Sequence, residues 1–154
     1  MLLALNYKQY NKDFVLLAEG TKNNILNEGE FYRIFYSPSH FTTNGIFIQF
    51  ALQSAYLESY FNKIKCIFKP DLNTNIIDFI KNLERDILAL VLTKNKNKIY
   101  RIDEQLSQGF IKIFSNDEYK KSPYDNINIL LKISGVWADE TSNGLTFRFF
   151  FIHQ

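Results

Sequence analysis

The sequence has few of the residues that build disulfides, metal sites or catalytic centres. Its 154 residues include one cysteine, Cys66, and two histidines, His40 and His153. A single cysteine excludes an intrachain disulfide and a zinc site made of several cysteines, and it is typical of a reducing compartment. Cys66 alternates with apolar neighbours, so we expect it to be buried. The histidines have no cysteine or carboxylate near them in the sequence, and we expect neither a metal nor a cofactor.

Long hydrophobic runs are also missing. No apolar run approaches the roughly 20 residues that a membrane-spanning helix needs. The start of the chain, residues 1–5, is too short for the apolar core of a signal peptide. We therefore expect a soluble intracellular protein with no membrane partner. With 154 residues and neither an internal repeat nor a linker, the chain predicts a single domain over 1–154.

Catalytic signatures are absent as well. The sequence contains no glycine-rich phosphate loop, no Gly-x-Ser-x-Gly and no His-Glu-x-x-His motif. Two acidic pairs, Asp103-Glu104 and Asp117-Glu118, are the candidate ligands of a metal-dependent nuclease. The second pair falls in a polar loop before Pro123, which favours solvated side chains over a metal site. We therefore predict that the protein is not an enzyme and keep a nuclease as the third hypothesis.

Aromatic side chains are what the sequence contains in quantity. Fifteen Phe and nine Tyr help to bring the aromatic content to 16%. The formal net charge is +2, well short of the strongly basic domains whose overall charge alone indicates nucleic acid. Any role in binding a polyanion must therefore depend on where the basic residues lie.

Strand patterns lie on both sides of one helical pattern. Alternating apolar and polar residues predict strands over 31–36, 45–52, 57–68 and 110–114. The end of the sequence predicts a long hairpin with strands at 127–137 and 144–152, which turns at Asn143-Gly144. Between these groups, apolar residues at helical spacing predict one central helix over about 74–93.

Two further segments are interpreted from turn and capping residues. Residues 2–18 predict an opening hairpin that turns at Asn11-Lys12-Asp13. Residues 99–108 are ambiguous, with Asp103 as the candidate N-cap of a short second helix. The order of strands, helix and strands predicts an α+β fold. Its sheet is mostly antiparallel or forms a partly closed barrel like that of an OB-fold.

The predicted strands share a composition on the faces turned away from the core. In each strand the uniformly apolar face is assigned to the core, which leaves basic and aromatic residues on the other face and no acidic ones. The residues expected to bind a ligand there are Phe61, Lys63, Lys65, Phe110, Lys112, Phe114, Lys132, Trp137, Arg148 and Phe150. A basic loop after the helix adds Lys94, Lys96 and Lys98 as phosphate contacts.

Basic and aromatic residues that alternate along strands suit single-stranded nucleic acid. Lysine and arginine neutralise phosphates and release counterions. Aromatic rings stack on unpaired bases, which contributes about 1–3 kcal/mol per base. Alternation along a strand places both kinds of side chain on one face, about 7 Å apart. We therefore predict a non-enzymatic protein that binds single-stranded DNA or RNA.

Other interpretations of the same side chains stay open. An outward phenylalanine can pack beneath the helix or against a second layer, while its neighbouring lysine reaches water. The aromatic strands can also form a subunit interface, which predicts a structural or assembly protein that forms a homo-oligomer. Trp137 is either a stacking residue at the mouth of the closing hairpin or a plug in the core.

The closing hairpin also resembles a known group of proteins. The segment Leu131–Trp137 (LKISGVW), followed by Gly144–Phe149 (GLTFRF), is similar to the C-terminal hairpin of small proteins of large DNA viruses and virus-like mobile elements. Some of these resemble single-stranded DNA-binding proteins. The resemblance covers residues 131–149 and carries over no functional residue. It implies a viral replication accessory protein that acts in the host cytoplasm or nucleus.

Overall fold

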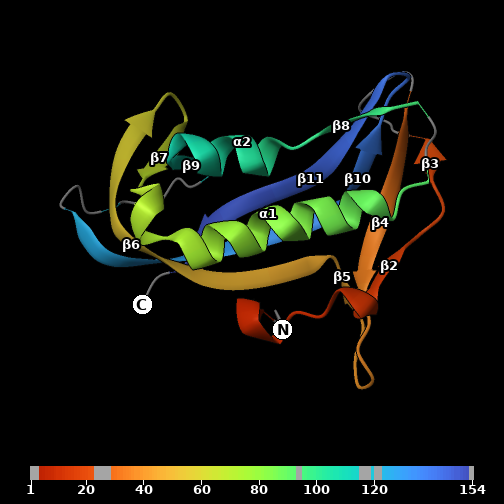
Figure 1. Ribbon diagram of the computed structural model, residues 1–154, viewed down its shortest axis with the longest axis horizontal. Coiled ribbons are helices and arrows are strands. Elements are labelled where there is room, and N and C mark those ends of the chain that lie inside the picture. Colours follow the sequence, from red (N-terminus) through yellow and green to blue (C-terminus); the bar gives the residue numbers. More distant parts are fainter. Residues whose placement is uncertain (1–3, 23–28, 93–94, 115–118, 120–122, 153–154) are drawn as a thin grey trace.

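Strands form most of the regular structure in the computed structural model, which describes residues 4–22, 29–92, 95–114, 119 and 123–152 (Figure 1). The strands are β1 (Leu5–Asn6), β2 (Val15–Leu17), β3 (Thr21–Lys22), β4 (Glu30–Tyr36), β5 (Thr43–Asn44), β6 (Ile46–Tyr60), β7 (Lys63–Ile67), β8 (Asn97–Ile99), β9 (Phe110–Ile113), β10 (Tyr124–Ala138) and β11 (Ser142–Phe151). The helices are α1 (Thr74–Ala89) and α2 (Arg101–Gln108), with short 3-10 helices η1 (Tyr7–Gln9), η2 (Lys12–Phe14) and η3 (Pro70–Leu72).

Five strands close into a barrel. Their order around it is β6, β7, β9, β11 and β10, and β10 pairs with β6 again to complete the ring. The seam between β9 and β11 is parallel and the other seams are antiparallel. The α+β fold and the OB-like barrel predicted from the sequence are thus confirmed. Both helices lie in the connection between β7 and β9.

The closing hairpin β10–β11 holds several parts of the fold together. From Tyr124 to Ile133, β10 pairs with β6, and beyond Ser134 it pairs with β4 instead. A β-bulge at Ser134 accompanies this change of partner, because Ile133 pairs with Phe147 but Gly135 pairs with Thr146. The predicted hairpin is therefore confirmed, and its first strand begins earlier than expected. The predicted turn at Asn143-Gly144 is wrong, because these residues pair with Ala138 and Trp137 within the ladder and the chain turns at 139–141 instead.

A bend in β6 lets this one strand pair with two others. The first part of β6 pairs with β10 and the last part with β7. Ser54 lies at the bend with a left-handed φ of 54°. The buried Asn73 side chain holds the bend: it accepts from the Gln53 N–H at 2.7 Å and donates to the Gln53 carbonyl at 3.1 Å and the Lys69 carbonyl at 3.0 Å. This contact connects the barrel to the start of α1.

The inward faces predicted for the strands form the core. The buried members are Ile46, Ile48, Phe50, Leu52, Ile64, Cys66, Ile111, Ile113, Ile127, Ile129, Leu131, Ile133, Leu145 and Phe149. At the centre, the Phe149 ring makes edge-to-face contacts with Phe50 at 6.4 Å and Phe147 at 5.6 Å between ring centroids. Burial raises the pKa of the Cys66 thiol to about 12, so this side chain is an inert part of the core.

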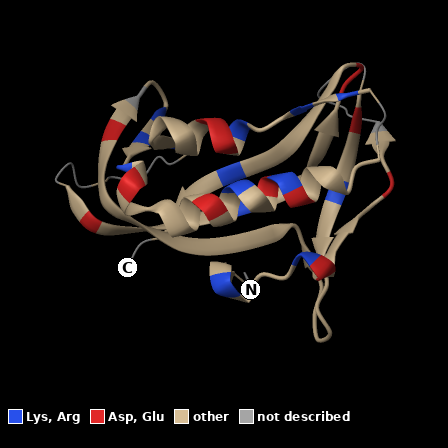
Figure 2. Cartoon of the chain, viewed as in Figure 1, with Lys and Arg blue, Asp and Glu red and all other residues tan. Residues whose placement is uncertain are grey.

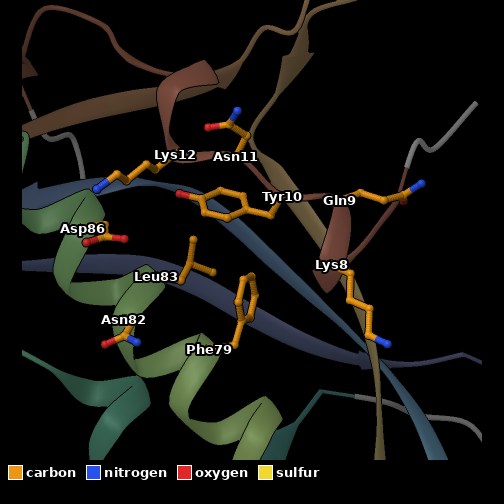
Figure 3. A pocket seen from close by; sticks show the side chains of 9 residues that line it. All are labelled: Lys8, Gln9, Tyr10, Asn11, Lys12, Phe79, Asn82, Leu83 and Asp86. Atoms are coloured by element: carbon orange, nitrogen blue, oxygen red, sulfur yellow. The ribbon is translucent and has the colours of Figure 1, made fainter.

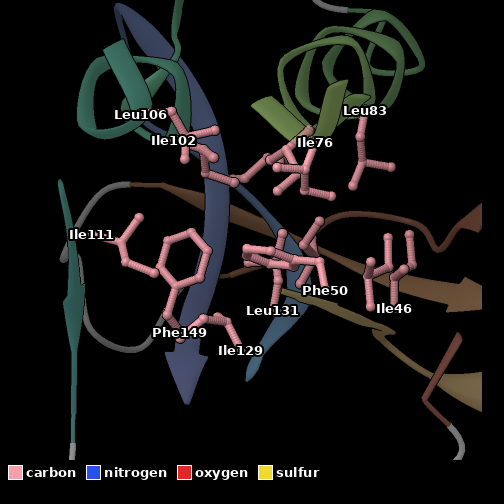
Figure 4. Packing of buried hydrophobic residues seen from close by; sticks show 14 of the residues in the cluster. Ile46, Phe50, Ile76, Leu83, Ile102, Leu106, Ile111, Ile129, Leu131 and Phe149 are labelled. Atoms are coloured by element: carbon pink, nitrogen blue, oxygen red, sulfur yellow. The ribbon is translucent and has the colours of Figure 1, made fainter. Parts of the chain in front are cut away.

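Both helices place their apolar faces against the barrel. Their buried apolar residues are Ile76, Ile77, Ile80, Leu83, Ile87 and Leu88 in α1, and Ile102 and Leu106 in α2. Figure 4 shows helix residues meeting Phe50, Leu131 and Phe149 from three strands of the barrel. The predicted central helix is confirmed, although it ends at Ala89. Within the described ranges, neither helix has the length and apolar content to cross a membrane.

Three other predictions about the elements are wrong. Residues 2–18 do not form a hairpin, because β1 pairs with β6 and β2 pairs with β4. Residues 57–68 are not one strand: β6 ends at Tyr60, the chain turns at Phe61-Asn62 and β7 returns. The ambiguous segment 99–108 contains a full second helix with Tyr100, and not Asp103, at its N-cap.

Candidate nucleic-acid interface

Three neighbouring strands of the barrel, β7, β9 and β11, carry only basic charges. Lys63 and Lys65 in β7, Lys112 in β9 and Arg148 in β11 are the charged residues of these three strands (Figure 2). Lys132 in β10 lies directly opposite Arg148 in the strand register and extends the row. Glu58, near the end of β6, is opposite Lys65 and is an acidic residue at the border of this surface. The predicted absence of outward acidic residues is therefore wrong at Glu58, because the chain reverses at Phe61-Asn62 and places Glu58 on the same face as Lys65.

The basic groups on this surface lie over aromatic rings. The Lys63 ammonium is 4.4 Å and the Arg148 guanidinium 5.1 Å from the centroid of the Phe114 ring. The Lys65 ammonium is 4.2 Å from the Phe110 ring. Cations within about 6 Å of a ring face are attracted to it. Each pair thus presents a positive charge beside a planar ring, which are the two features that bind a phosphate and an unpaired base.

A groove of about 320 Å³ collects side chains from four strands and α2. Five of the residues predicted from the sequence line it, namely Lys63, Lys112, Phe114, Trp137 and Arg148. Its remaining lining residues are Arg101, Gln105, Leu145, Thr146, Phe147 and Phe149. The groove lies where β9 and β11 meet at a single register pair, Ile113 with Phe149. The fold therefore brings together residues that are far apart in the chain.

Trp137 lines this groove together with Arg101 of α2. Its indole lies over Gly144, where an added Cβ atom would come within 2.8 Å of the ring. The Arg101 guanidinium is 6.0 Å from the centroid of the indole ring. Trp137 is half-buried and lines the groove, so the core-plug interpretation is wrong.

Helix α2 supplies two lining residues that the sequence analysis missed. Arg101 is the first residue of the helix, and Gln105 follows one turn later. The Gln105 side chain accepts a hydrogen bond from the Lys112 N–H at 3.0 Å, which fixes α2 to β9. A helix start at Arg101 would have placed both residues on one face. The prediction placed the start of the helix near Asp103, so it did not place Arg101 and Gln105 on one helix face.

The buried Glu84 side chain of α1 holds the N-terminal end of α2. Its carboxylate accepts hydrogen bonds from the Ile102 N–H at 3.0 Å and the Asp103 N–H at 2.9 Å. Burial raises the pKa of Glu84 to about 7, against the lowering effect of these two bonds. The Asp103 carboxylate forms ion pairs with Lys81 at 3.4 Å and Arg85 at 3.0 Å. Helix α2 is therefore fixed to α1 by several polar contacts.

Other predicted residues lie outside the groove. Phe150 is half-buried and opposite Leu130 in the hairpin register. Lys98 in β8 pairs with Asn143 beside the tip of β10–β11. Hydrogen bonds from Thr141 and Ser142 lower the pKa of Asp139 in that tip, with a smaller contribution from Lys96. Lys94 lies outside the described residues.

The described residues provide no metal centre. Among them, no group of three or more His, Cys, Asp or Glu side chains is arranged to hold a metal ion. Asp103 is engaged by Lys81 and Arg85, while Asp117, Glu118 and His153 lie outside the described residues.

A second hollow, of about 610 Å³, lies between the N-terminal segment and α1 (Figure 3). Lys8, Lys12 and Asp86 line it together with the rings of Tyr10 and Phe79. Its charges have both signs, and none of the residues predicted to bind nucleic acid lies in it. This hollow therefore does not match the predicted basic and aromatic surface.

No protein family, curated protein or solved structure matches this chain. The assignment of the groove therefore depends on its own geometry.

Proposed function

We propose that the protein binds single-stranded nucleic acid, DNA in the first instance, in the groove between β9, β11 and α2, and that it catalyses no reaction. One observation carries this proposal. Lys63, Lys112, Trp137 and Arg148 come from four different strands, Phe114 directly follows β9, and all five line one groove.

The chemistry of the groove favours an extended single strand over other anions. Lys63, Lys112, Arg101 and Arg148 supply positive charges along it, which attract the phosphates of a polyanion. Phe114 and Trp137 supply ring faces on which bases stack. A duplex hides the faces of its bases, so these rings favour unpaired strands.

The biological role that we propose is that of a replication accessory protein inside the cell. The resemblance of residues 131–149 to the closing hairpin of small proteins from large DNA viruses supports this role. Arg148 belongs both to that hairpin and to the groove lining.

Fluorescence anisotropy with labelled oligonucleotides of about 12 nucleotides, within the usual site size of an OB-fold, tests the proposal. We expect binding to single strands that weakens with salt, and much weaker binding to the matching duplex. Lys63→Gln combined with Arg148→Gln should weaken binding at least about tenfold, whereas Lys8→Gln, outside the groove, should not. Equal affinity for duplex and single strand, or no binding at low salt, would contradict the proposal.

A second candidate function is assembly through an apolar surface. Leu16, Leu90 and Leu92 are 53%, 45% and 96% exposed and lie outside the groove. Exposed apolar side chains favour a homo-oligomer where they form one continuous patch. Light scattering separates the candidates, because a large oligomer without affinity for nucleic acid supports assembly and contradicts the first proposal.

A further inference from the structure

One edge of β11 is open between two strands that pair with it. On the side away from β10, β8 pairs with residues 142–144 of β11, and β9 pairs with Phe149 alone. Helix α2 takes up the chain between β8 and β9 (Figure 1). Among the residues that the structure describes, no strand pairs with residues 145–148 on this side, and all four of them line the groove. The groove therefore contains a strand edge that a ligand can reach.

The backbone groups on this edge have a fixed order. The N–H and C=O groups of successive residues in a strand point to opposite edges. Thr141, directly before β11, accepts from the Asn97 N–H of β8 at 2.8 Å, whereas Ile152, directly after β11, donates to a carbonyl of β10 at 3.1 Å. Odd-numbered residues thus point away from β10. Beyond β8, the open edge presents the Leu145 carbonyl, the Phe147 N–H and the Phe147 carbonyl.

This order of acceptor, donor and acceptor complements the Watson–Crick edge of adenine. The N6 amino group of adenine can donate to the Leu145 carbonyl, N1 can accept from the Phe147 N–H, and the C2–H can act as a weak third donor. Thymine has the same order as the strand edge, so its acceptors would face carbonyls. Guanine would turn its N1–H toward the Phe147 N–H, and cytosine would turn its O2 toward a carbonyl. Such mismatched polar groups are costly in a binding site.

Aromatic rings lie at both ends of the open edge. The Trp137 indole lies over Gly144, directly before the open residues. At the other end, the Phe114 ring is 5.1 Å from the guanidinium of Arg148. A base held by the strand edge therefore has ring faces beside it for stacking. The groove volume of about 320 Å³ is at the small end of the range for ligand sites and suits a single nucleotide.

We infer that the open edge of β11 is a subsite selective for adenine, in which the Leu145 carbonyl and the Phe147 N–H bind the Watson–Crick edge of one unpaired base. This inference rests on the proposed function and specifies the sequence preference of the same groove. Added peptide strands also bind open edges, but β8 and β9 occupy this edge on both sides of residues 145–148. In a duplex, thymine occupies the Watson–Crick edge of adenine, so the subsite also favours single strands.

Anisotropy with three labelled single strands of about 12 nucleotides tests the inference. Each strand alternates cytosine with adenine, thymine or purine, and purine is adenine without its N6 amino group. Two good hydrogen bonds to a base discriminate by about fivefold to a hundredfold, and we expect adenine to bind tighter than thymine and purine by a factor in this range. Purine keeps the ring surface of adenine, so it separates hydrogen bonding from stacking. A strand with 1-deazaadenine should bind like purine, and one with 7-deazaadenine like adenine.

Two substitutions of Phe147 test the protein side. Phe147→Pro removes the N–H of the subsite, which points away from β10, so the β10–β11 ladder keeps its hydrogen bonds. Phe147→Leu is the matched control, because it also removes the ring but keeps the N–H. Relative to this control, Phe147→Pro should lose the preference for adenine and bind the thymine strand within about twofold.

The base analogues decide the inference with the unmodified protein, whether or not Phe147→Pro folds. Binding of single strands with equal affinity for adenine and thymine would overturn the inference and leave the proposed function intact. A preference that purine retains, or that survives in Phe147→Pro, would have the same consequence. Absence of all binding would overturn both.

Discussion

Lys65 and Lys112 lie directly opposite each other in the β7–β9 ladder. Lys132 and Arg148 make a second such pair across β10 and β11. Like charges at directly opposed positions destabilise a sheet. One member of each pair, Lys112 or Arg148, lines the groove that we propose for phosphate binding, where an anionic ligand would relieve the repulsion. The arrangement is thus unfavourable for folding alone and favourable for binding a polyanion.

Replacement of Lys112 should separate the effect of the opposed charges on folding from their effect on binding. Lys112→Thr should raise the free energy of unfolding by about 0.2–1 kcal/mol, because it removes one of two opposed charges. The same variant should bind single-stranded DNA more weakly, with a salt dependence lower by about one phosphate contact. Urea unfolding and a salt titration of anisotropy measure the two changes. Lys69→Thr, an exposed lysine outside the ladder, is the control, and loss of stability in Lys112→Thr would contradict the interpretation.

Glycine at position 61 should improve stability. Phe61 has a left-handed φ of 53°. Phe61→Gly removes the strain of this backbone and should raise the free energy of unfolding by about 1 kcal/mol, or the midpoint of thermal unfolding by about 2–4 °C. Phe61→Ala removes the same ring but keeps a Cβ atom, so it should retain the strain. Thermal unfolding of both variants separates backbone strain from ring packing. A loss of stability in both would show that the ring stabilises the fold.

Asn73 should be among the most sensitive polar residues. Asn73→Ala removes three hydrogen bonds and leaves the Gln53 backbone without its partner at the bend of β6. Leaving such groups unsatisfied costs about 1–3 kcal/mol each, and we expect the variant to lose at least about 2 kcal/mol in urea unfolding. Asn75→Ala, an exposed position in the first turn of α1, should change stability by less than about 0.5 kcal/mol.

Residue periodicity predicted the core of this fold well. Burial of one face of a strand or helix requires apolar residues to recur with the period of that element. The alternation of Ile127, Ile129 and Leu131, and the helical spacing in α1, predicted residues that are buried in the structure. Periodicity could not reveal the reversal at Phe61-Asn62, since no glycine marks the turn. It also could not reveal closure of the barrel, which depends on the long-range pairing of β10 with β6.

The residues of the groove were only partly predictable from the sequence, because a groove depends on long-range packing. Alternation indicates which side chains point outward, and it correctly grouped Lys63, Lys112 and Arg148. Which outward residues share a groove depends on the order of strands, and no local pattern contains that order. Arg101 joined the groove through the packing of α2, which is set by the buried carboxylate of Glu84.

Glu84 should make the stability of the protein depend on pH. Its side chain is 1% exposed, and burial raises its pKa from the usual 4.5 to about 7, with smaller contributions from the charges of Asp103 and Glu104. Between these two values the folded protein binds more protons at this site than the unfolded chain does. The free energy of unfolding therefore falls as pH rises through this window, by at most about 3 kcal/mol.

Glu84→Gln is the variant that tests this dependence. The glutamine side chain can accept one of the two backbone hydrogen bonds and does not titrate, so the contribution of this site should become independent of pH. Urea unfolding from about pH 5 to about pH 8 covers the window in which the wild type should lose stability. Subtracting the variant's profile from that of the wild type removes the contributions of the other titrating groups. Parallel profiles for the two proteins would show that Glu84 is ionised throughout this range, and that its hydrogen bonds to Ile102 and Asp103 outweigh the cost of burial.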